Sequence, residues 1–234
     1  MFHVEQSSRT PATPDPVSPA AAIMEGGLRL GIPLSPHTVA RLVLYLQELT
    51  RWNAKVNLTG HATQADIIAK DFLDSLAACT LITPDPRLIR PGPGLRVLDV
   101  GAGAGFPGLV LTLQDPGLAV TLLEPAQKKA AFLHHLIGLL GISGTTVLIT
   151  RIEDLIRGPK PGPSGPFDLI TSRAVRPALI LSEAPRLLAP DGRVLLFRAS
   201  PMSGAPPGYR LLRETSFTLP FTNDPRTLTL LQPA

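Results

Sequence analysis

The spacing of apolar residues predicts helices in the first third of the chain. Ser35 and Pro36 form a favourable helix start, with a capping hydroxyl followed by proline at the first helical position. After them, apolar residues recur at the interval of one helical face: Leu42, Tyr45, Leu46, Leu49, Trp52 and Val56. A second helix is predicted from Thr63, also a favoured N-cap, through Leu76. We expect the apolar face of the first helix to pack on the main domain.

From Leu95 onward the pattern alternates between short apolar runs and helical segments. Strands are predicted at 95–100, 119–124, 145–150, 167–171 and 193–197, with helices beginning at 109 and spanning 126–140. Two last runs, 209–219 and 226–231, predict antiparallel strands joined by a turn at 223–225. This alternation predicts an α/β, Rossmann-like fold with a mostly parallel sheet and antiparallel C-terminal strands.

Composition divides the chain into three parts. Residues 1–20 are rich in proline, serine and threonine and contain little that could be buried, so we expect a disordered arm. Residues 21–94 form the predicted N-terminal helical extension, which ends in a turn-rich linker at 84–94. Residues 95–234 form the main domain. A chain of 234 residues has room for one such domain and its extension.

Charge and cysteine content narrow the functional classes. A net charge of +4 permits a polyanionic partner, although the arginines are scattered along the chain. Cys79 is the only cysteine, which excludes an intrachain disulfide and favours a cytoplasmic protein. The five histidines show no metal-ligand spacing, so we expect no metal. The most apolar segment, 130–142, is too short to span a bilayer, and we expect no membrane association.

The most informative segment is the glycine-rich stretch 97–108, VLDVGAGAGFPG, which joins a predicted strand to a predicted helix. Glycine has no Cβ, so Gly101, Gly103 and Gly105 can adopt positive φ. We expect such a turn to leave backbone N–H groups open to a bound small molecule. The segment therefore predicts a nucleotide-type ligand.

Two ligands compete for this turn. Residues 103–108 match G-x-G-x-x-G, which would indicate a dinucleotide and an NAD-binding oxidoreductase. Asp99 opposes that reading, because a fixed negative charge repels a pyrophosphate but suits the cationic S-adenosylmethionine. Pro107 also removes an N–H that an anion would use. Glu124, 19 residues after Gly105, can accept hydrogen bonds from the ribose of either ligand. By fold analogy, the closing antiparallel pair is typical of methyltransferases.

Five blocks of sequence together resemble the RsmG (GidB) family of bacterial 16S rRNA guanine-N7 methyltransferases. They are Arg51–Thr59, Phe72–Leu76, Val97–Gly108, Arg151–Leu155 and Ser172–Ala174, and the resemblance covers about residues 35–200. It implies a class I methyltransferase sheet with S-adenosyl-L-methionine as cofactor. It also implies, as target, N7 of guanine 527 (RNA numbering) in the 530 loop of 16S rRNA, presented by the rRNA or the small ribosomal subunit.

The resemblance carries cofactor contacts to specific positions. These are Gly101 and Phe106 in the loop, Ile152 and Glu153 after the 145–150 strand, and Arg173 after the 167–171 strand. In this interpretation Glu124 holds the ribose, Ile152 packs on the adenine face, and the loop at Glu153 and Asp154 meets the adenine edge. Asp99, Gly103 and Gly105 complete the candidate cofactor site.

The chain shows no Ser/His/Asp or Cys/His nucleophile set, and the implied reaction needs none. Guanine N7 already carries an in-plane lone pair, so proximity, alignment and electrostatic matching can drive methyl transfer without a general base. We expect Arg173 to act near the transfer site through electrostatics and positioning, with Asp99 organising the methionine end.

RNA binding requires contacts to phosphates, for which arginine is well suited. The candidates are Arg51, Lys55, Arg173, Arg176 and Arg198. Trp52 belongs to the apolar helical face, so we expect it to pack in the core rather than on a base. Asn53 and Asn57 are expected to cap and turn the chain.

The chain departs from the family pattern at two places. Lys70-Asp71 replaces the usual histidine before the Leu-Asp-Ser block, and Arg198-Ala199 replaces Lys-Gly after the 193–197 strand. Arg198 keeps a cation there but changes its reach. A methyltransferase for another RNA or a small molecule, and a catalytically silent RNA-binding or ribosome-assembly factor, are the remaining alternatives.

Overall fold

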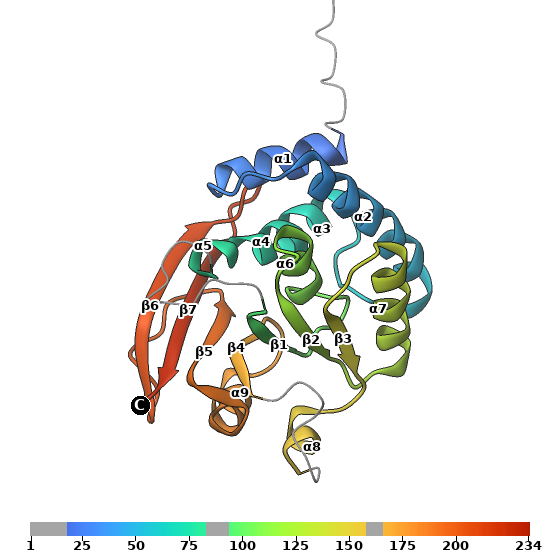
Figure 1. The fold of residues 1–234 in the computed structure, drawn as a ribbon. Coiled ribbons are helices and arrows are strands. Elements are labelled where there is room, and N and C mark those ends of the chain that lie inside the picture. The colour runs from blue at the N-terminus through green and yellow to red at the C-terminus, as the bar shows by residue number, and fades with distance from the viewer. Residues whose placement is uncertain (1–17, 83–93, 158–165) are drawn as a thin grey trace, which may run out of the picture.

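A computed structural model of the chain describes residues 18–82, 94–157 and 166–234, and its centre is a seven-stranded sheet (Figure 1). The strands lie in the order β3-β2-β1-β4-β5-β7-β6. Their bounds are β1 (Arg96–Val100), β2 (Ala119–Leu123), β3 (Thr145–Leu148), β4 (Phe167–Ser172), β5 (Leu188–Arg198), β6 (Tyr209–Thr218) and β7 (Pro225–Pro233). Each strand was predicted from the sequence, although β5 begins five residues earlier than expected.

The directions of the strands confirm the predicted Rossmann-like fold. β3, β2, β1, β4 and β5 are parallel, whereas β7 is antiparallel to both β5 and β6. The C-terminal hairpin therefore folds back so that β7, the last strand in the chain, lies between β5 and β6. The strand order reverses between β1 and β4, and open α/β sheets bind their ligands at such a reversal.

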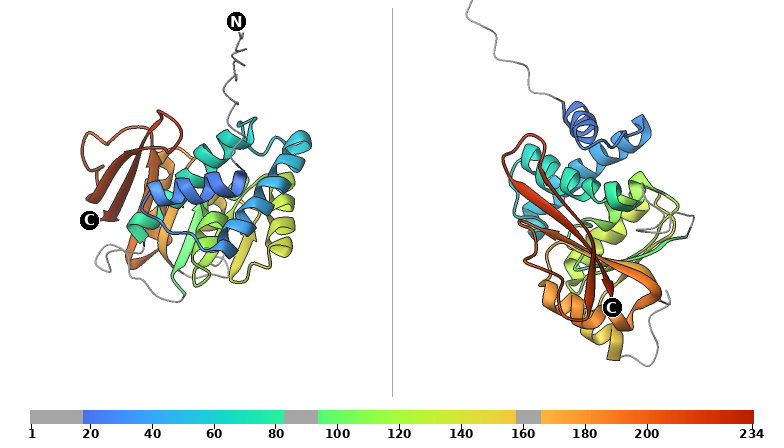
Figure 2. Two further views of the ribbon diagram at one scale, coloured as in Figure 1. Left: turned by 90° about the horizontal axis from the view of Figure 1, so that it is seen from above. Right: turned by 90° about the vertical axis from the view of Figure 1, so that its left-hand side faces the viewer.

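Helices cover both faces of the sheet. Along β1, Val97 belongs to one apolar core cluster, while Leu98 and Val100 belong to the other, as expected for a strand buried on both sides. The first face carries α2 (Pro36–Val56), α6 (Gly108–Gln114) and α7 (Gln127–Leu139), and the second carries α8 (Ile152–Arg157) and α9 (Pro177–Glu183) (Figures 1 and 2). A short 3₁₀ turn, η2 (Ala184–Arg186), follows α9. The predicted linker at 84–94 lies almost entirely outside the described residues.

The N-terminal helices differ from expectation at their start. α1 (Pro19–Arg29) was not predicted, and the side chain of Ser18 caps it. The last residues of the expected arm are therefore helical, and residues 1–17 lie outside the described part of the chain. For α2, the predicted cap is confirmed, because Ser35 Oγ accepts a hydrogen bond from the N–H of Thr38 at 3.0 Å.

The second predicted helix is divided into short helical elements. They extend beyond its predicted end at Leu76, and a turn at Ala78 separates the last two. Thr63 caps the first element as expected, and the run of elements passes through α3 (Gln64–Ile67), the π-helical turn η1 (Ile68–Leu73), α4 (Asp74–Ala77) and α5 (Cys79–Ile82). π turns are rare and recur at functional sites. Here η1 contains Asp71, a fully buried acidic residue.

Tyr45 of α2 joins the N-terminal helices to the glycine loop. Its ring is stacked on that of Phe106 at 5.4 Å and also packs against Phe72 and Phe132. Its hydroxyl donates a hydrogen bond to the backbone carbonyl of Ala104 in the loop. Burial removes the hydroxyl from water and raises the pKa of Tyr45 well above its usual value. The helices before residue 82 and the sheet therefore share one continuous core.

Among the described helices, none combines the length and the apolar character that a bilayer crossing would require.

Candidate cofactor site at the carboxyl ends of β1, β2 and β4

A hollow of about 310 Å³ opens at the point where the strand order reverses. Gly101, Glu124, Ile152 and Glu153 line it, and all four were predicted from the sequence as cofactor residues. Val175, from the loop after β4, forms part of the opposite wall. The structure thus brings together residues from the ends of three parallel strands and from the start of α8.

The glycine loop has the predicted backbone conformation. Gly101, Gly103 and Gly105 have φ values of +74°, +59° and +102°. A Cβ on Gly101 would lie 2.5 Å from Cγ2 of Val175, so the loop after β4 approaches closer than any side chain would permit. Glycine at this position is required both by φ and by the close approach.

The expectation that the loop N–H groups are open to a ligand is wrong. The N–H of Gly101 bonds the carbonyl of Leu123 at 2.8 Å, and the N–H of Gly105 bonds the carbonyl of Ala102 at 2.7 Å. The N–H of Gly103 donates to the carboxylate of Glu124 at 2.9 Å. The loop folds back onto the end of β2, and these three N–H groups donate to acceptors within the protein. Gly101 therefore borders the hollow through its backbone, and its N–H group is already bonded to Leu123.

Glu124 follows β2 and is buried, with 5 % of its surface exposed. One carboxylate oxygen accepts the Gly103 N–H, and the other accepts the N–H of Ala126 at 2.8 Å. A carboxylate has about four acceptor positions, so capacity remains for hydroxyl donors that enter the hollow. The two backbone bonds hold the side chain in one orientation.

Ile152 and Glu153 begin α8 after β3. Ile152 is buried, with 3 % exposed, and presents its apolar surface to the second core and to the hollow. Glu153 is half-buried and lies in the first turn of the helix. The hollow therefore combines an apolar surface with acceptor groups, a polarity that suits an adenosine.

Asp99 lies behind the loop rather than in the hollow. It is fully buried, and its Oδ2 accepts the N–H of Gly108 at 2.8 Å at the start of α6. Its Oδ1 has no hydrogen-bond partner among the described residues. Burial raises the pKa of Asp99 to about 7, so the charge of this carboxylate depends on pH near neutrality. Five predicted cofactor residues do not line the hollow: Asp99, Gly103, Gly105, Phe106 and Arg173.

Arg173, in the loop after β4, contacts Phe106 of the glycine loop. The Arg173 guanidinium lies over the Phe106 ring, 5.1 Å from its centroid, and the side chain is 20 % exposed. It donates hydrogen bonds to the Asp71 carboxylate and to the carbonyl of Lys70, the latter at 2.7 Å. Asp74 also lies 3.6 Å from this guanidinium.

Sequence reasoning missed the role of Asp71 and Asp74 at this position. The departure from the family pattern at Lys70-Asp71 drew attention to this position. The sequence could not show that Asp71 pairs with Arg173, because the two residues are 102 positions apart. The neighbouring Ser172 holds the same segment in place. Its hydroxyl donates to the carbonyl of Val100 at 2.9 Å and accepts the N–H of Val175 at 3.3 Å.

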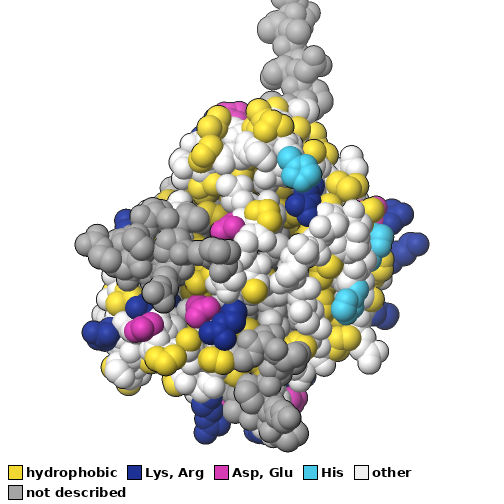
Figure 3. All heavy atoms as spheres, viewed as in Figure 1, with side chains coloured by type: hydrophobic (Ala, Val, Ile, Leu, Met, Phe, Trp, Pro, Cys, Tyr) yellow, Lys and Arg dark blue, Asp and Glu magenta, His cyan; other side chains and the backbone are white. Residues whose placement is uncertain are grey.

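The predicted RNA contacts lie on the surface. Arg51, Lys55 and Arg176 are exposed, whereas Arg198 is half-buried and donates to the carbonyl of Ser200 at 3.1 Å. Figure 3 shows Lys and Arg side chains together with histidines along the edge formed by α2 and α7. Arg51 also pairs with Glu48 at 2.5 Å.

Three other residues have the structural roles that the sequence predicted. Trp52 is half-buried against Phe132 and His135. Asn57 ends α2 at φ +53°, and the side-chain oxygen of Asn53 accepts the N–H groups of two residues in the turn that follows. These contacts give Trp52, Asn53 and Asn57 structural roles that do not require RNA.

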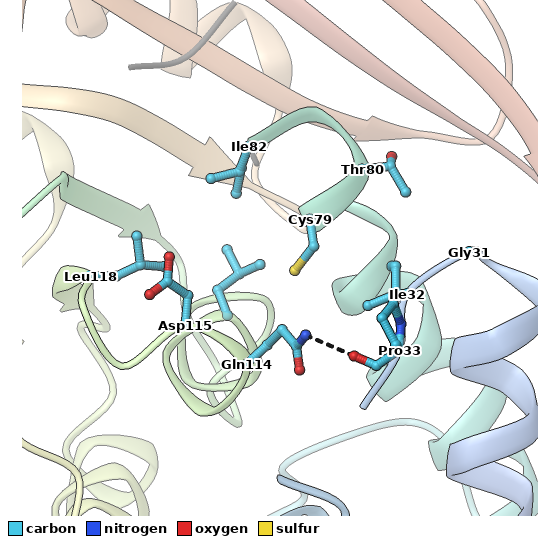
Figure 4. Close-up of a pocket in the computed structure, with 10 residues that line it drawn as sticks. Gly31, Ile32, Pro33, Cys79, Thr80, Ile82, Gln114, Asp115 and Leu118 are labelled. Atoms are coloured by element: carbon cyan, nitrogen blue, oxygen red, sulfur yellow. Dashed lines mark hydrogen bonds between the residues drawn. The ribbon is translucent and has the colours of Figure 1, made fainter. Parts of the chain in front are cut away.

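A larger cavity of about 500 Å³ lies at the opposite end of the sheet, near the amino end of β2 (Figure 4). Its lining includes Ile32, Cys79, Gln114 and Leu118, and the side chain of Gln114 donates to the carbonyl of Pro33 at 3.2 Å. Burial raises the pKa of Cys79 to about 12, so the thiol is a poor nucleophile. Within the described residues, no group of three or more His, Cys, Asp or Glu side chains could hold a metal ion.

Comparison with known proteins points to a single family. Residues 38–203 match the family model described as rRNA small subunit methyltransferase G. The ribosomal RNA small subunit methyltransferase G of Geobacter sulfurreducens is 34% identical over 217 residues, which covers 88% of this chain and 94% of that protein. The protein of the same name from Polynucleobacter asymbioticus is 36% identical over 172 residues, covering 73% and 74%.

A solved structure shares the fold at lower sequence identity. The crystal structure of TrmN from Thermus thermophilus aligns with a TM-score of 0.53 and 21% identity. The alignment covers 71% of this chain and 53% of TrmN. At this identity the likeness supports the fold alone.

Proposed function

Because this chain belongs to the rRNA small subunit methyltransferase G family, we propose that it transfers a methyl group from S-adenosyl-L-methionine to N7 of guanine 527 in 16S rRNA. The observation that carries this proposal is the hollow lined by Gly101, Glu124, Ile152 and Glu153. Its polarity suits an adenosine, and it lies at the point where the strand order reverses.

The residues present fit this cofactor better than a dinucleotide. A pyrophosphate would need the N–H groups at the start of α6, but the Gly108 N–H already donates to Asp99. The N–H groups of Gly101, Gly103 and Gly105 also donate hydrogen bonds within the protein. Glu124 remains able to accept the ribose hydroxyls, and Ile152 supplies an apolar surface for the adenine. This arrangement disfavours an NAD-binding oxidoreductase.

The chain's own residues would act by binding and alignment. S-adenosylmethionine supplies an electrophilic methyl group on a sulfonium, and guanine N7 supplies the lone pair, so no proton needs to be removed first. Phe106 and the loop after β4 would form the wall between cofactor and base, with Arg173 at their junction. Arg173 is the proposed electrostatic and positioning residue of the transfer site.

The RNA would approach across the face that carries the exposed cations. Arg51 and Lys55 lie on α2, and Arg176 lies at the start of α9, so phosphates could be contacted on either side of the hollow. Arg198 would contribute less, since it is half-buried and bonded to the backbone of its own loop. The substrate could be free rRNA or the assembled small subunit. Assaying both as substrates distinguishes these two forms.

The decisive experiment offers small ribosomal subunits that lack the modification, together with labelled S-adenosylmethionine and the purified protein. Naked 16S rRNA is tested in parallel, and 7-methylguanine is mapped by chemical strand cleavage. We expect label and cleavage at guanine 527 only. Label at another nucleotide would support an RNA methyltransferase but show that guanine 527 is not its target. Binding of the cofactor without label in either RNA would favour a silent ribosome-assembly factor.

A further inference from the structure

Arg173 presents an electrostatic difficulty for the proposed cofactor. Its guanidinium lies over Phe106 in the glycine loop, and Val175, two residues later, lines the hollow. S-adenosylmethionine carries a positive sulfonium, and like charges in a partly buried site repel strongly because little water screens them. An arginine placed here without a counter-charge would oppose the binding of the cofactor that it is supposed to serve.

Asp71 supplies that counter-charge to Arg173. It is fully buried in the π-helical turn η1, and its Oδ1 accepts a hydrogen bond from the guanidinium. Its Oδ2 accepts from the Thr59 hydroxyl at 3.0 Å and lies 2.9 Å from Nδ1 of His61. A carboxylate bonded on both oxygens is held firmly in one place.

A second acidic residue, Asp74, and a second arginine, Arg226, lie next to this ion pair. Asp74 lies one turn after Asp71, 3.6 Å from Arg173 and 3.5 Å from Arg226 of β7. The formal charges of the two aspartates and the two arginines cancel. Burial raises the pKa of Asp74. Asp71 is the carboxylate that accepts a hydrogen bond directly from Arg173.

We propose that Asp71 is a positioning residue that neutralises Arg173 and thereby strengthens binding of the cationic cofactor relative to its neutral thioether product. This inference rests on the proposed function, because it presumes S-adenosylmethionine as the ligand. During transfer the carbon–sulfur bond breaks as the nitrogen–carbon bond forms, and the positive charge passes from sulfur to the purine. S-adenosylhomocysteine, the product, is neutral at sulfur, so its binding depends less on whether Arg173 is neutralised.

The test compares two ligands that differ at the sulfur by one methyl group and one charge. Dissociation constants for S-adenosylmethionine and S-adenosylhomocysteine are measured by calorimetry for the wild type, Asp71→Asn and Asp66→Asn. The Asp66 variant removes the same charge from the same helical run, at a side chain that pairs with Lys70 and not with Arg173. We expect Asp71→Asn to raise the ratio of the two dissociation constants, methionine form over homocysteine form, by about fivefold. Asp66→Asn should leave the ratio unchanged.

Two further variants separate charge from structure. Arg173→Gln leaves Asp71 without its counter-charge, so the ratio should move in the opposite direction and favour S-adenosylmethionine. The double variant Asp71→Asn/Arg173→Gln is neutral again, and its ratio should return toward the wild-type value even if both ligands bind more weakly. A purely structural role for Asp71 would weaken both ligands equally and would predict no return in the double variant. If Asp71→Asn does not fold, the comparison of the double variant with Arg173→Gln measures the effect of Asp71 on the ratio.

The outcomes distinguish this inference from the proposed function. If the wild type binds neither ligand, the proposed cofactor is wrong and the selectivity assigned to Asp71 is rejected with it. If the wild type binds both but the ratio is the same in Asp71→Asn and Arg173→Gln, the proposed cofactor stands and the charge selection by Asp71 is overturned.

Discussion

Glu124 accepts a hydrogen bond from the backbone N–H of Gly103 at 2.9 Å, so the acidic residue at the end of β2 holds the middle of the glycine loop. The same carboxylate lines the hollow proposed for the cofactor. One side chain therefore both holds the loop and lines the hollow. This double role makes Glu124 the most direct test of the cofactor site.

Substitution of Glu124 by glutamine should weaken S-adenosylhomocysteine binding by about tenfold, equivalent to ~1.4 kcal/mol. The amide keeps the size of the side chain but offers only a neutral oxygen to the ribose hydroxyls, and hydrogen bonds to charged groups are the stronger ones. Calorimetry measures the change. Glu25→Gln on the exposed face of α1 is the control and should bind normally. Unchanged affinity in Glu124→Gln would remove Glu124 from the site.

Gly101→Ala should block cofactor binding, whereas Gly141→Ala should not. Both glycines have positive φ, so each alanine costs roughly 1–2 kcal/mol of backbone strain. Only at Gly101 would the new Cβ collide with Val175, at 2.5 Å, while nothing lies within 4 Å at Gly141. Thermal unfolding should show that both variants are destabilised, and calorimetry should show loss of binding for Gly101→Ala alone. Equal binding by the two variants would contradict the placement of Gly101 against Val175 in the site.

Arg173→Ala should lower the rate of methyl transfer to the small subunit by at least tenfold, because the transfer site loses its only described cation above Phe106. The variant also leaves Asp71 buried beside an empty space, which costs stability. Single-turnover rates at saturating cofactor separate this effect from weaker binding. Normal cofactor affinity together with a normal rate would show that Arg173 has no part in the reaction.

Asp99 should make stability depend on pH in the acid range. Its pKa is raised from 3.8 to about 7 on folding because burial favours the neutral form. The folded protein then binds this proton more tightly than the unfolded chain does, so the stabilisation is complete below pH ~4 and is lost as the pH rises toward 7. The loss amounts to about 1.4 kcal/mol per pH unit within that window.

Asp99→Asn removes this titration, although the amide can still accept the Gly108 N–H. The free energy of unfolding of the variant minus that of the wild type should therefore increase between about pH 4.5 and pH 7, at roughly 1.4 kcal/mol per unit. Urea unfolding at several pH values measures it. A difference that stays constant with pH would mean that Asp99 is ionised throughout, as the sequence led us to expect.

Arg51→Ala and Lys55→Ala should each weaken RNA binding without affecting the cofactor. Both side chains are exposed on α2, and removing one phosphate-binding cation should reduce the slope of log affinity against log salt by about 0.7–0.9. Arg29→Ala, on the exposed face of α1, is the charge-matched control. Binding of unmodified small subunits is measured at several salt concentrations. An unchanged slope in both variants would place the RNA on another face.

The sequence by itself determined most of the elements and predicted the residues of the candidate cofactor site. Alternating apolar runs predict the strands, Ser35 and Thr63 predict two helix starts, and the glycine segment predicts a turn with positive φ. Each depends on residues within about one turn of each other, which a single sequence displays. α1 is the exception, because Gly26 and Gly27 weaken a helical prediction. A Cβ on Gly26 would meet Leu73 at 2.2 Å, so close packing in the folded protein requires glycine there.

Only the tertiary structure decided which groups are satisfied and which are charged. The loop N–H groups are bonded to β2 and to the loop itself, Asp99 is enclosed behind the loop, and Asp71 meets Arg173 across 102 residues of sequence. Burial and long-range pairing depend on how the layers come together, and they set the energy of a charge far more than its neighbours in sequence do. The sequence therefore indicates where the cofactor should bind, while the folded packing determines how Arg173 and Asp71 divide the charge at that site.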